Sequence, residues 1–212
     1  MSIWVKICGV TSIADAMMVA AAGAQAIGLN FVPSSKRRVE VEQARIIVSA
    51  LRERYGTAVD IIGVFADQVK ERVLEVVQGC GLDGFQLHGG ESPAELTWFI
   101  KQDVFADKAL GIADPGDVAR LLAYPGTVKL VDAKVDGELG GTGRTFDWSL
   151  VRELNQSTKL ILAGGLTPEN VSHAISALGP YGVDTASGVE SSPGVKDERL
   201  VTEFIQRCRV TT

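Results

Sequence analysis

The chain lacks a long hydrophobic run. Its longest apolar stretch, Met17–Leu29, is interrupted by Gln25 and is shorter than the roughly 20 residues that cross a bilayer. The opening residues MSIWVK also lack the basic, apolar and small-residue order of a secretory signal peptide. We therefore predict no membrane partner and a cytoplasmic location.

Cysteine, histidine and positive charge are all scarce. The cysteines Cys8, Cys80 and Cys208 and the two histidines form no Cys-x-x-Cys or Cys/His pattern, which disfavours a disulfide framework and a metal site. Lys and Arg total 21 against 26 Asp and Glu, giving a net charge of −5 and a pI near 5.1. This balance argues against a nucleic-acid or anionic-membrane surface, so we predict no nucleic-acid partner.

Proline is rare as well, with 7 residues, and the sequence has no low-complexity tract. Glycine, in contrast, accounts for 23 of 212 residues, about 11% against a usual share of about 7%. With 46% hydrophobic and 22% charged residues, the composition is that of a globular chain with one sizeable core. We predict a single domain over residues 1–212, with the extra glycines at specific turns.

Short apolar runs rich in β-branched residues alternate with amphipathic stretches along the whole chain. Such alternation is typical of parallel strands covered by helices. Eight units leave roughly 26 residues each, which favours an α/β fold with one closed (β/α)8 barrel, a TIM barrel, over a doubly wound open sheet. The runs are Ile3–Ile7, Ala26–Phe31, Asp60–Phe65, Gly84–Leu87, Val104–Ala109, Thr127–Val131, Lys159–Ala163 and Gly182–Ala186.

Helix-start signals lie between these runs, where a hydroxyl residue precedes a proline or an acidic residue. The segments Ser12–Asp15, Ser92–Glu95 and Thr167–Asn170 have this pattern. The one long loop, Ala133–Thr145, follows the sixth run and contains Gly140-Gly-Thr-Gly143. It is either a cover over a site or only a flexible connection.

Two kinds of glycine motif must be separated. Segment Gly79–Gly84 has the letters of the dinucleotide fingerprint, but it follows a predicted helix and precedes a strand, the reverse of the required order. We interpret it as a helix stop. Gly164, Gly165 and Gly188 follow the seventh and eighth strands, where barrels of this class often bind phosphate through backbone N–H groups.

Candidate catalytic side chains stand where strands end at the active face. Cys8 ends the first strand, and near positive charge it can act as a base, although most lone cysteines are buried hydrophobes. Asp132 ends the sixth strand, on the opposite side of the barrel opening from Cys8. It either acts as an acid paired with a base at Cys8, or accepts hydrogen bonds from loop N–H groups. Lys6 lies one layer deeper and suits a buried ion pair. Asp184 either contacts a sugar hydroxyl or pairs with Lys6.

Basic residues and histidines complete the candidate site. Segment Ser34–Arg38 gathers three cations, of which one arginine turned inward can grip a carboxylate while the others face water. His88 ends the fourth strand and either lines the mouth or bonds to a backbone carbonyl. His173 lies within a predicted helix and is expected to be exposed.

Taken in order, these motifs resemble the phosphoribosylanthranilate isomerase family across the whole chain. Asn30 departs from the pattern, because many relatives are expected to have an apolar residue there. The segments that carry the resemblance are Lys6–Gly9 with Thr11, Gly28–Phe31, Ser35–Arg37, Gly63–Phe65, Gln86–Gly89, Gly140–Gly143 with Phe146–Trp148, Ala163–Asn170, and Ser187–Glu190 with Pro193 and Gly194.

The resemblance implies a cofactor-free Amadori rearrangement in tryptophan biosynthesis, which converts N-(5-phosphoribosyl)anthranilate into 1-(2-carboxyphenylamino)-1-deoxyribulose 5-phosphate. It implies that Asp132 is the general acid, Cys8 the general base and Arg37 the group that binds the anthranilate carboxylate. A small phosphosugar is then the partner of a monomer or homodimer. The phosphate would be held by Gly164, Gly165, Ser187 and Gly188.

Two other functions compete with this one. The histidine-pathway isomerase performs the same rearrangement, but its relatives are expected to have Asp where this chain has Cys8, and a second phosphate site. A noncatalytic barrel that binds a phosphorylated ligand needs no acid and base on opposite walls. The pair Cys8 and Asp132 therefore favours the function of the phosphoribosylanthranilate isomerase family.

Overall fold

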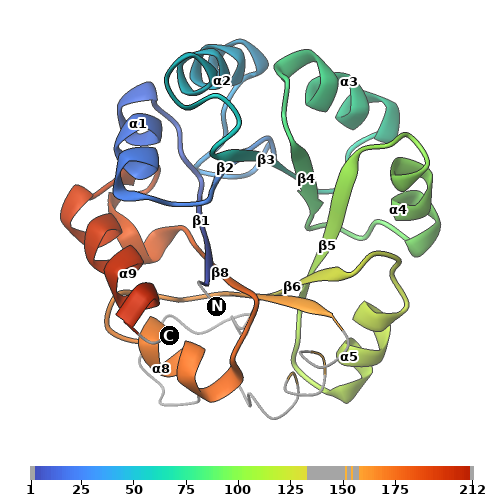
Figure 1. The fold of residues 1–212 in the computed structure, drawn as a ribbon. Helices are drawn as coiled ribbons and strands as arrows, with labels where there is room; N and C mark the ends of the chain where they lie inside the picture. Colours follow the sequence, from blue (N-terminus) through green and yellow to red (C-terminus); the bar gives the residue numbers. More distant parts are fainter. Residues whose placement is uncertain (1–2, 133–150, 152–153, 155–157, 211–212) are drawn as a thin grey trace.

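The computed structural model describes residues 3–132, 151, 154 and 158–210. The predicted loop Ala133–Thr145 and the segment Phe146–Trp148 lie outside the described residues. The view along the barrel axis in Figure 1 shows strands at the centre and helices in a ring around them.

Eight parallel strands hydrogen-bond in sequence order, and β1 closes the barrel against β8. The prediction of a (β/α)8 barrel is confirmed, and three predicted runs have the same bounds as the strands. Closure leaves none of these eight strands with an open edge. The strands are β1 (Trp4–Cys8), β2 (Ala26–Asn30), β3 (Asp60–Phe65), β4 (Gly84–Leu87), β5 (Phe105–Gly111), β6 (Val128–Asp132), β7 (Lys159–Ala163) and β8 (Gly182–Thr185).

Helices cover the outside of the barrel. Ser12 caps the first helix by accepting from the N–H of Asp15, and Ser92 and Glu95 form a capping box at α4, as their sequence pattern predicts. The helices are α1 (Ile13–Ala22), α2 (Val41–Tyr55), α3 (Lys70–Cys80), α4 (Pro93–Ile100), α5 (Pro115–Leu122), α8 (Val171–Leu178) and α9 (Glu198–Val210), with a short 3-10 helix η1 (Ser187–Val189).

The helix start predicted at Thr167 is wrong. The side chain of Asn170 accepts from the N–H of Thr167 and donates to the carbonyl of Gly165. These bonds close a turn, so α8 begins only at Val171. The interpretation of Gly79–Gly84 is confirmed, because α3 ends at Cys80, Gly81 has a left-handed backbone and β4 begins at Gly84.

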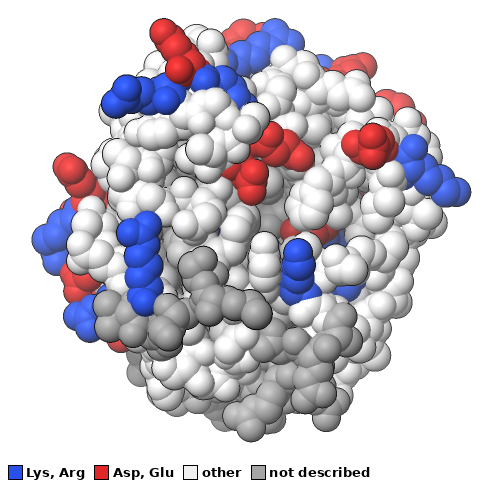
Figure 2. Space-filling model, in the orientation of Figure 1, with Lys and Arg blue, Asp and Glu red and all other residues white. Residues whose placement is uncertain are grey.

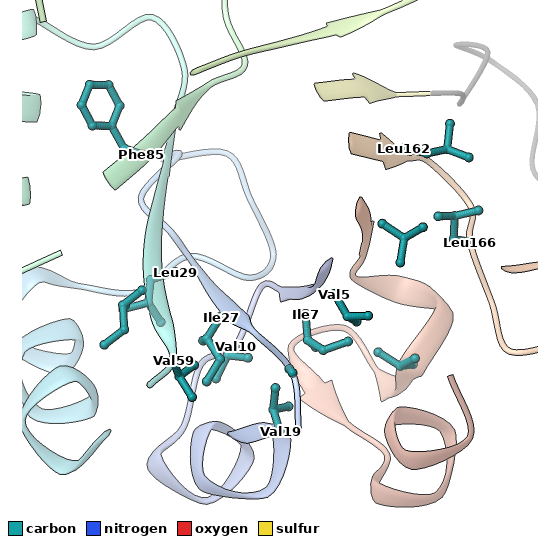
Figure 3. Close-up of a cluster of buried hydrophobic side chains, with 14 of the residues drawn as sticks. Val5, Ile7, Val10, Val19, Ile27, Leu29, Val59, Phe85, Leu162 and Leu166 are labelled. Carbon is teal, nitrogen blue, oxygen red and sulfur yellow. The ribbon is translucent and has the colours of Figure 1, made fainter. Parts of the chain in front are cut away.

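The main hydrophobic core lies between the barrel and its helices. Figure 3 shows Ile7 of β1 and Ile27 of β2 close to Val19 of α1, and all three are buried. Because strand side chains alternate, the residues between these core positions point into the barrel. Lys6, Gln86 and Asp107 are such residues, and all are almost fully buried.

A small hairpin after β8 was not predicted. Its strands, β9 (Glu190–Ser192) and β10 (Val195–Lys196), pair antiparallel before α9 begins. Thr11, which follows β1, donates to the carbonyl of Gly194 in this hairpin. The hairpin therefore reaches back over the carboxyl end of the first strand.

Within the described part of the chain, no helix combines the length and apolarity that crossing a bilayer requires. On the face shown in Figure 2, basic side chains lie mostly at the periphery, while several acidic side chains lie nearer the middle.

Candidate active site at the carboxyl ends of the strands

Cys8 ends β1 at the mouth of the barrel and is half-buried. The neighbouring position on β2 is Gly28, where a Cβ atom would approach the Cys8 sulfur to 2.7 Å. Glycine is needed here because a side chain would displace the thiol. Asn30, on the same strand, accepts from the N–H of Val32, so its amide oxygen is used within its own turn.

Burial raises the pKa of the Cys8 thiol above its usual range, and the carboxyl group of Asp184 raises it further. The positive charges of Lys6 and Lys196 act in the opposite direction. The resting thiol is therefore protonated at neutral pH, with two cations placed to stabilise the thiolate when it forms.

Lys6 and Asp184 form a buried ion pair inside the barrel. The distance from Lys6 Nζ to Asp184 Oδ2 is 2.7 Å, and Lys6 also donates to Gln86 Oε1 at 2.8 Å. Burial lowers the pKa of Lys6, but the charges of Asp184 and Cys8 more than offset this effect and raise it overall. The ion pair predicted for Lys6 is confirmed. The other oxygen of Asp184, Oδ1, has no hydrogen-bond partner among the described residues.

Asp132 ends β6 and is half-buried. It acts electrostatically on Asp184. Burial and the charge of Asp132 both raise the pKa of Asp184. The structure thus brings two carboxyl groups together on the side of the mouth formed by β6 and β8. Cys8 stands on β1, which pairs directly with β8.

Arg37 turns inward, whereas Lys36 and Arg38 are exposed. Its guanidinium grips Glu190 in a two-point fork, from Nε to Oε1 at 2.8 Å and from Nη2 to Oε2 at 2.6 Å. A Cβ at Gly9 would collide with the Arg37 side chain, so this arginine lies directly over the residue that follows Cys8.

Glu190 also accepts from Lys196 Nζ at 2.8 Å, and the same ammonium donates to the carbonyl of Ala186. The sequence reasoning missed both Glu190 and Lys196 as parts of the site. Glu190 stood in a motif that was otherwise assigned to phosphate. Lys196 stands directly before Asp197 and Glu198 in the sequence, and that pattern does not indicate that the lysine is buried.

The two predicted phosphate loops lie side by side. Gly164 and Gly165 have φ values of +89° and +64°, which residues with a Cβ rarely adopt. Thr185 donates to the carbonyl of Leu166 at 2.7 Å, and a Cβ at Gly188 would collide with that same carbonyl. The turn after β7 and the start of η1, where Ser187 and Gly188 lie, therefore touch through backbone atoms.

The histidines lie apart. His88 follows β4 at the mouth, and its backbone N–H donates to the backbone carbonyl of Phe65. His88 is exposed, yet the surrounding protein and the charges of Lys6 and Lys108 lower the pKa of its imidazole, so the neutral form of the ring is favoured. His173 lies in α8 and is exposed, as predicted. Among the described residues, no group of three or more His, Cys, Asp or Glu could hold a metal ion.

Titratable side chains from β1, β6 and β8 meet at the carboxyl ends of a closed parallel barrel, the end where barrels of this type have their active sites. Fold and site together define a (β/α)8-barrel enzyme. The family model described as N-(5'-phosphoribosyl)anthranilate (PRA) isomerase matches residues 5–207, and the chain belongs to this family. The resemblance inferred from the motifs is thereby confirmed.

Curated relatives and solved structures agree with this assignment. The chain is 43% identical to N-(5'-phosphoribosyl)anthranilate isomerase of Rubrobacter xylanophilus, over 97% of this chain and 98% of the relative. The phosphoribosyl anthranilate isomerase of Thermotoga maritima superposes with a TM-score of 0.87 at 39% identity, covering 98% of this chain and 99% of that one.

A further solved phosphoribosyl anthranilate isomerase is 37% identical with a TM-score of 0.86, and the match covers 98% of this chain and 99% of that one. It is in complex with reduced 1-(o-carboxyphenylamino)-1-deoxyribulose 5-phosphate.

Proposed function

We propose that this protein converts N-(5'-phosphoribosyl)anthranilate into 1-(2-carboxyphenylamino)-1-deoxyribulose 5-phosphate in tryptophan biosynthesis. Membership of the isomerase family over residues 5–207 carries this proposal. The placement of Cys8 and Asp132 at the carboxyl ends of β1 and β6 supports it, because the rearrangement needs an acid and a base.

Asp132 is the general acid of the proposed reaction. Its carboxyl group donates a proton to the ring oxygen of the ribose, the C1′–O bond breaks, and the nitrogen lone pair forms the C1′=N double bond of an iminium ion. This step needs a protonated Asp132, which lies close enough to Asp184 for the two carboxyl groups to interact electrostatically. Ring opening makes the proton on C2′ acidic.

Cys8 is the general base. In the reactive form the thiol has lost its own proton to solvent. The thiolate then removes the C2′ proton, and the C–H electron pair forms the C1′=C2′ double bond of an enolamine while the iminium nitrogen becomes neutral. The enolamine then tautomerises to the ketone by losing its hydroxyl proton and gaining one at C1′. Lys6 and Lys196 favour the thiolate, so a base with a raised pKa suffices once the acid has acted.

Substrate binding uses groups on opposite sides of Cys8. Glu190 occupies Nε and one Nη2 hydrogen of Arg37, which leaves three of the five guanidinium hydrogens for the anthranilate carboxylate. Asp184 Oδ1, which has no partner among the residues that the structure describes, accepts from a sugar hydroxyl, and His88 lines the mouth. The phosphate binds to backbone N–H groups of the adjoining loops at Gly164, Gly165, Ser187 and Gly188.

The test is an assay of the purified protein with phosphoribosylanthranilate and without added metal or nucleotide. We expect loss of the anthranilate-type fluorescence together with formation of the carboxyphenylamino product. Binding of substrate without turnover would instead support the noncatalytic barrel. Preferred turnover of the histidine-pathway substrate would identify the other isomerase.

The proposal also covers where and in what form the enzyme works. We infer a cytoplasmic enzyme that acts as a monomer or a homodimer on a small phosphosugar. Light scattering coupled to size-exclusion chromatography distinguishes the two forms, because a monomer has the chain mass of 22.5 kDa and a homodimer has twice that mass.

A further inference from the structure

A cavity lies at the amino ends of the strands, away from the candidate active site. It has a volume of about 290 Å³, near the lower end of the range of about 300–1,000 Å³ for ligand pockets. Its lining includes the first residues of five strands, Trp4, Asp60, Phe105, Val128 and Lys159, together with Ile62, Asp83, Gln86, Asp107, Ile161 and Tyr181.

A buried carboxyl group lines the inner part of this cavity. Asp107 of β5 is only 3% exposed. Its Oδ2 accepts a long hydrogen bond of 3.4 Å from the amide of Gln86, and its Oδ1 has no hydrogen-bond partner among the described residues. A buried polar atom without a partner is destabilising, so a donor entering the cavity gains a ready acceptor.

The walls around this acceptor are apolar and aromatic. Ile62 and Ile161 lie on the inner walls, and the rings of Trp4 and Tyr181 stack with centroids 6.5 Å apart. An apolar cavity of roughly 150 Å³ is enough to bind benzene. A cavity of about 290 Å³ therefore accommodates a ring and a short polar arm.

The charges of the lining favour a cation. It contains the carboxyl groups of Asp60, Asp83 and Asp107 and the ammonium of Lys159. Asp83 is paired with Arg52 at 2.5 Å, so the carboxyl groups of Asp60 and Asp107 stand against that one lysine. Lys159 is itself engaged, with its Nζ 4.9 Å from the centroid of the Tyr181 ring. Aromatic faces beside carboxylates attract organic cations.

We propose that this cavity is a binding site for a small organic ammonium ion with an apolar body. The ammonium group donates to Oδ1 of Asp107, and the body packs between Ile62 and Ile161 beneath the aromatic side chains of the rim. The site is separate from the isomerase chemistry, so it stands whether or not the proposed reaction does.

The electrostatics of Asp107 agree with this assignment. Burial raises its pKa to about 7, against the opposing charges of Lys6 and Lys129, and Asp184 raises it further. A bound ammonium ion stabilises the ionised carboxylate. Binding therefore releases a proton near neutral pH.

The experiment is isothermal titration calorimetry of the full chain with benzylammonium chloride, with benzyl alcohol as the neutral probe of similar shape. We expect benzylammonium to bind the wild-type protein at least about 10-fold more tightly than benzyl alcohol, as a charge-assisted hydrogen bond requires. Equal affinities, or no binding of benzylammonium, would overturn the proposal.

Variants locate the bound cation. Asp107→Asn should weaken benzylammonium binding at least about 10-fold, while Lys159→Gln, a change at an exposed residue, should tighten it about two- to fivefold by removing a like charge. Glu53→Gln, exposed on α2, is the matched control and should leave the affinity unchanged. If Asp107→Asn does not fold, unchanged or weaker binding in Lys159→Gln still contradicts the proposal.

Discussion

The two ends of the barrel interior each hold a buried carboxyl group with one oxygen that has no hydrogen-bond partner among the described residues, and their surroundings differ. Towards the carboxyl ends of the strands, Asp184 forms an ion pair with the ammonium group of Lys6 at 2.7 Å. Towards the amino ends, the carboxyl group of Asp107 accepts a hydrogen bond of 3.4 Å from the amide of Gln86, and no other from the part of the chain that the structure describes. Lys6 also donates to Gln86, so a chain of polar contacts joins the two carboxyl groups.

The position of Lys6 accounts for this difference between the two ends. The direct ion pair with Lys6 favours the charged form of Asp184 against the effect of burial, whereas burial raises the pKa of Asp107, one amide further away, to about 7. The end used for catalysis thus has a lysine in direct contact with its buried carboxyl group, and the other end has a carboxyl group whose charge changes near neutral pH. Five variants test this contrast.

Cys8→Ala and Asp132→Ala should have the largest effect, lowering kcat by about 10²–10⁴-fold each while binding of a reduced product analogue changes little. Cys80→Ala is the control, because Cys80 is a buried cysteine at the end of α3 outside the proposed site. Steady-state kinetics and analogue titration measure both quantities. Full turnover in Cys8→Ala would remove Cys8 as the base.

Lys6→Met should lower the free energy of unfolding by about 3–5 kcal/mol, because it leaves the buried carboxylate of Asp184 without its cation. The control Lys101→Met, at an exposed lysine after α4, should change stability by no more than about 0.5 kcal/mol. Urea denaturation measures both. A loss in Lys6→Met as small as in the control would mean that the pair does not hold the interior together.

Arg37→Ala should raise KM about 10- to 100-fold, the equivalent of a lost charge-assisted contact, with kcat nearly unchanged because substrate and transition state share the carboxylate. Glu190 keeps its bond to Lys196 in this variant, so the hairpin after β8 should persist. A wild-type KM would exclude Arg37 from substrate binding.

Asp107→Asn should show the smallest effect, a gain in stability that depends on pH. The pKa of Asp107 is raised from an ordinary 3.8 to about 7 in the folded protein, so between these values the unfolded chain has already lost its proton and stability falls as pH rises. Asparagine does not titrate. Its advantage should grow by about 2 kcal/mol between pH 5.5 and pH 7, at 1.36 kcal/mol per pKa unit, and level off above.

Thermal unfolding at several pH values measures this difference. Glu53→Gln on the surface of α2 serves as the control, and its difference from the wild type should stay within about 0.5 kcal/mol throughout. A constant advantage for Asp107→Asn would show that Asp107 does not titrate in this range.

Local patterns were enough to predict the barrel. Apolar runs gave strands within two residues of their observed ends, and the caps at Ser12 and Ser92 gave two helix starts, because these signals depend on near neighbours in the sequence. Thr167 misled because Asn170, three residues later, closes a turn with its side chain. The alternation along β1 also predicted a buried ion pair for Lys6, and the structure shows which of the two roles considered for Asp184 accounts for its contact with that lysine.

Contacts between distant segments were beyond such patterns. Nothing near Arg37 indicates Glu190, which lies 153 residues later, and nothing near Gln86 shows that its amide reaches Asp107. The register of the closed barrel decides which residues meet, and that register follows from the packing of all eight strands.

The fork between Arg37 and Glu190 has a consequence for how the protein is made. It joins residues 153 positions apart, and the pair of Lys6 and Asp184 joins residues 178 positions apart. A chain growing from its N-terminus on the ribosome therefore exposes Cys8 long before the partners that charge and shape its surroundings exist. Appearance of activity during synthesis would mark the moment at which the last strand has closed the ring.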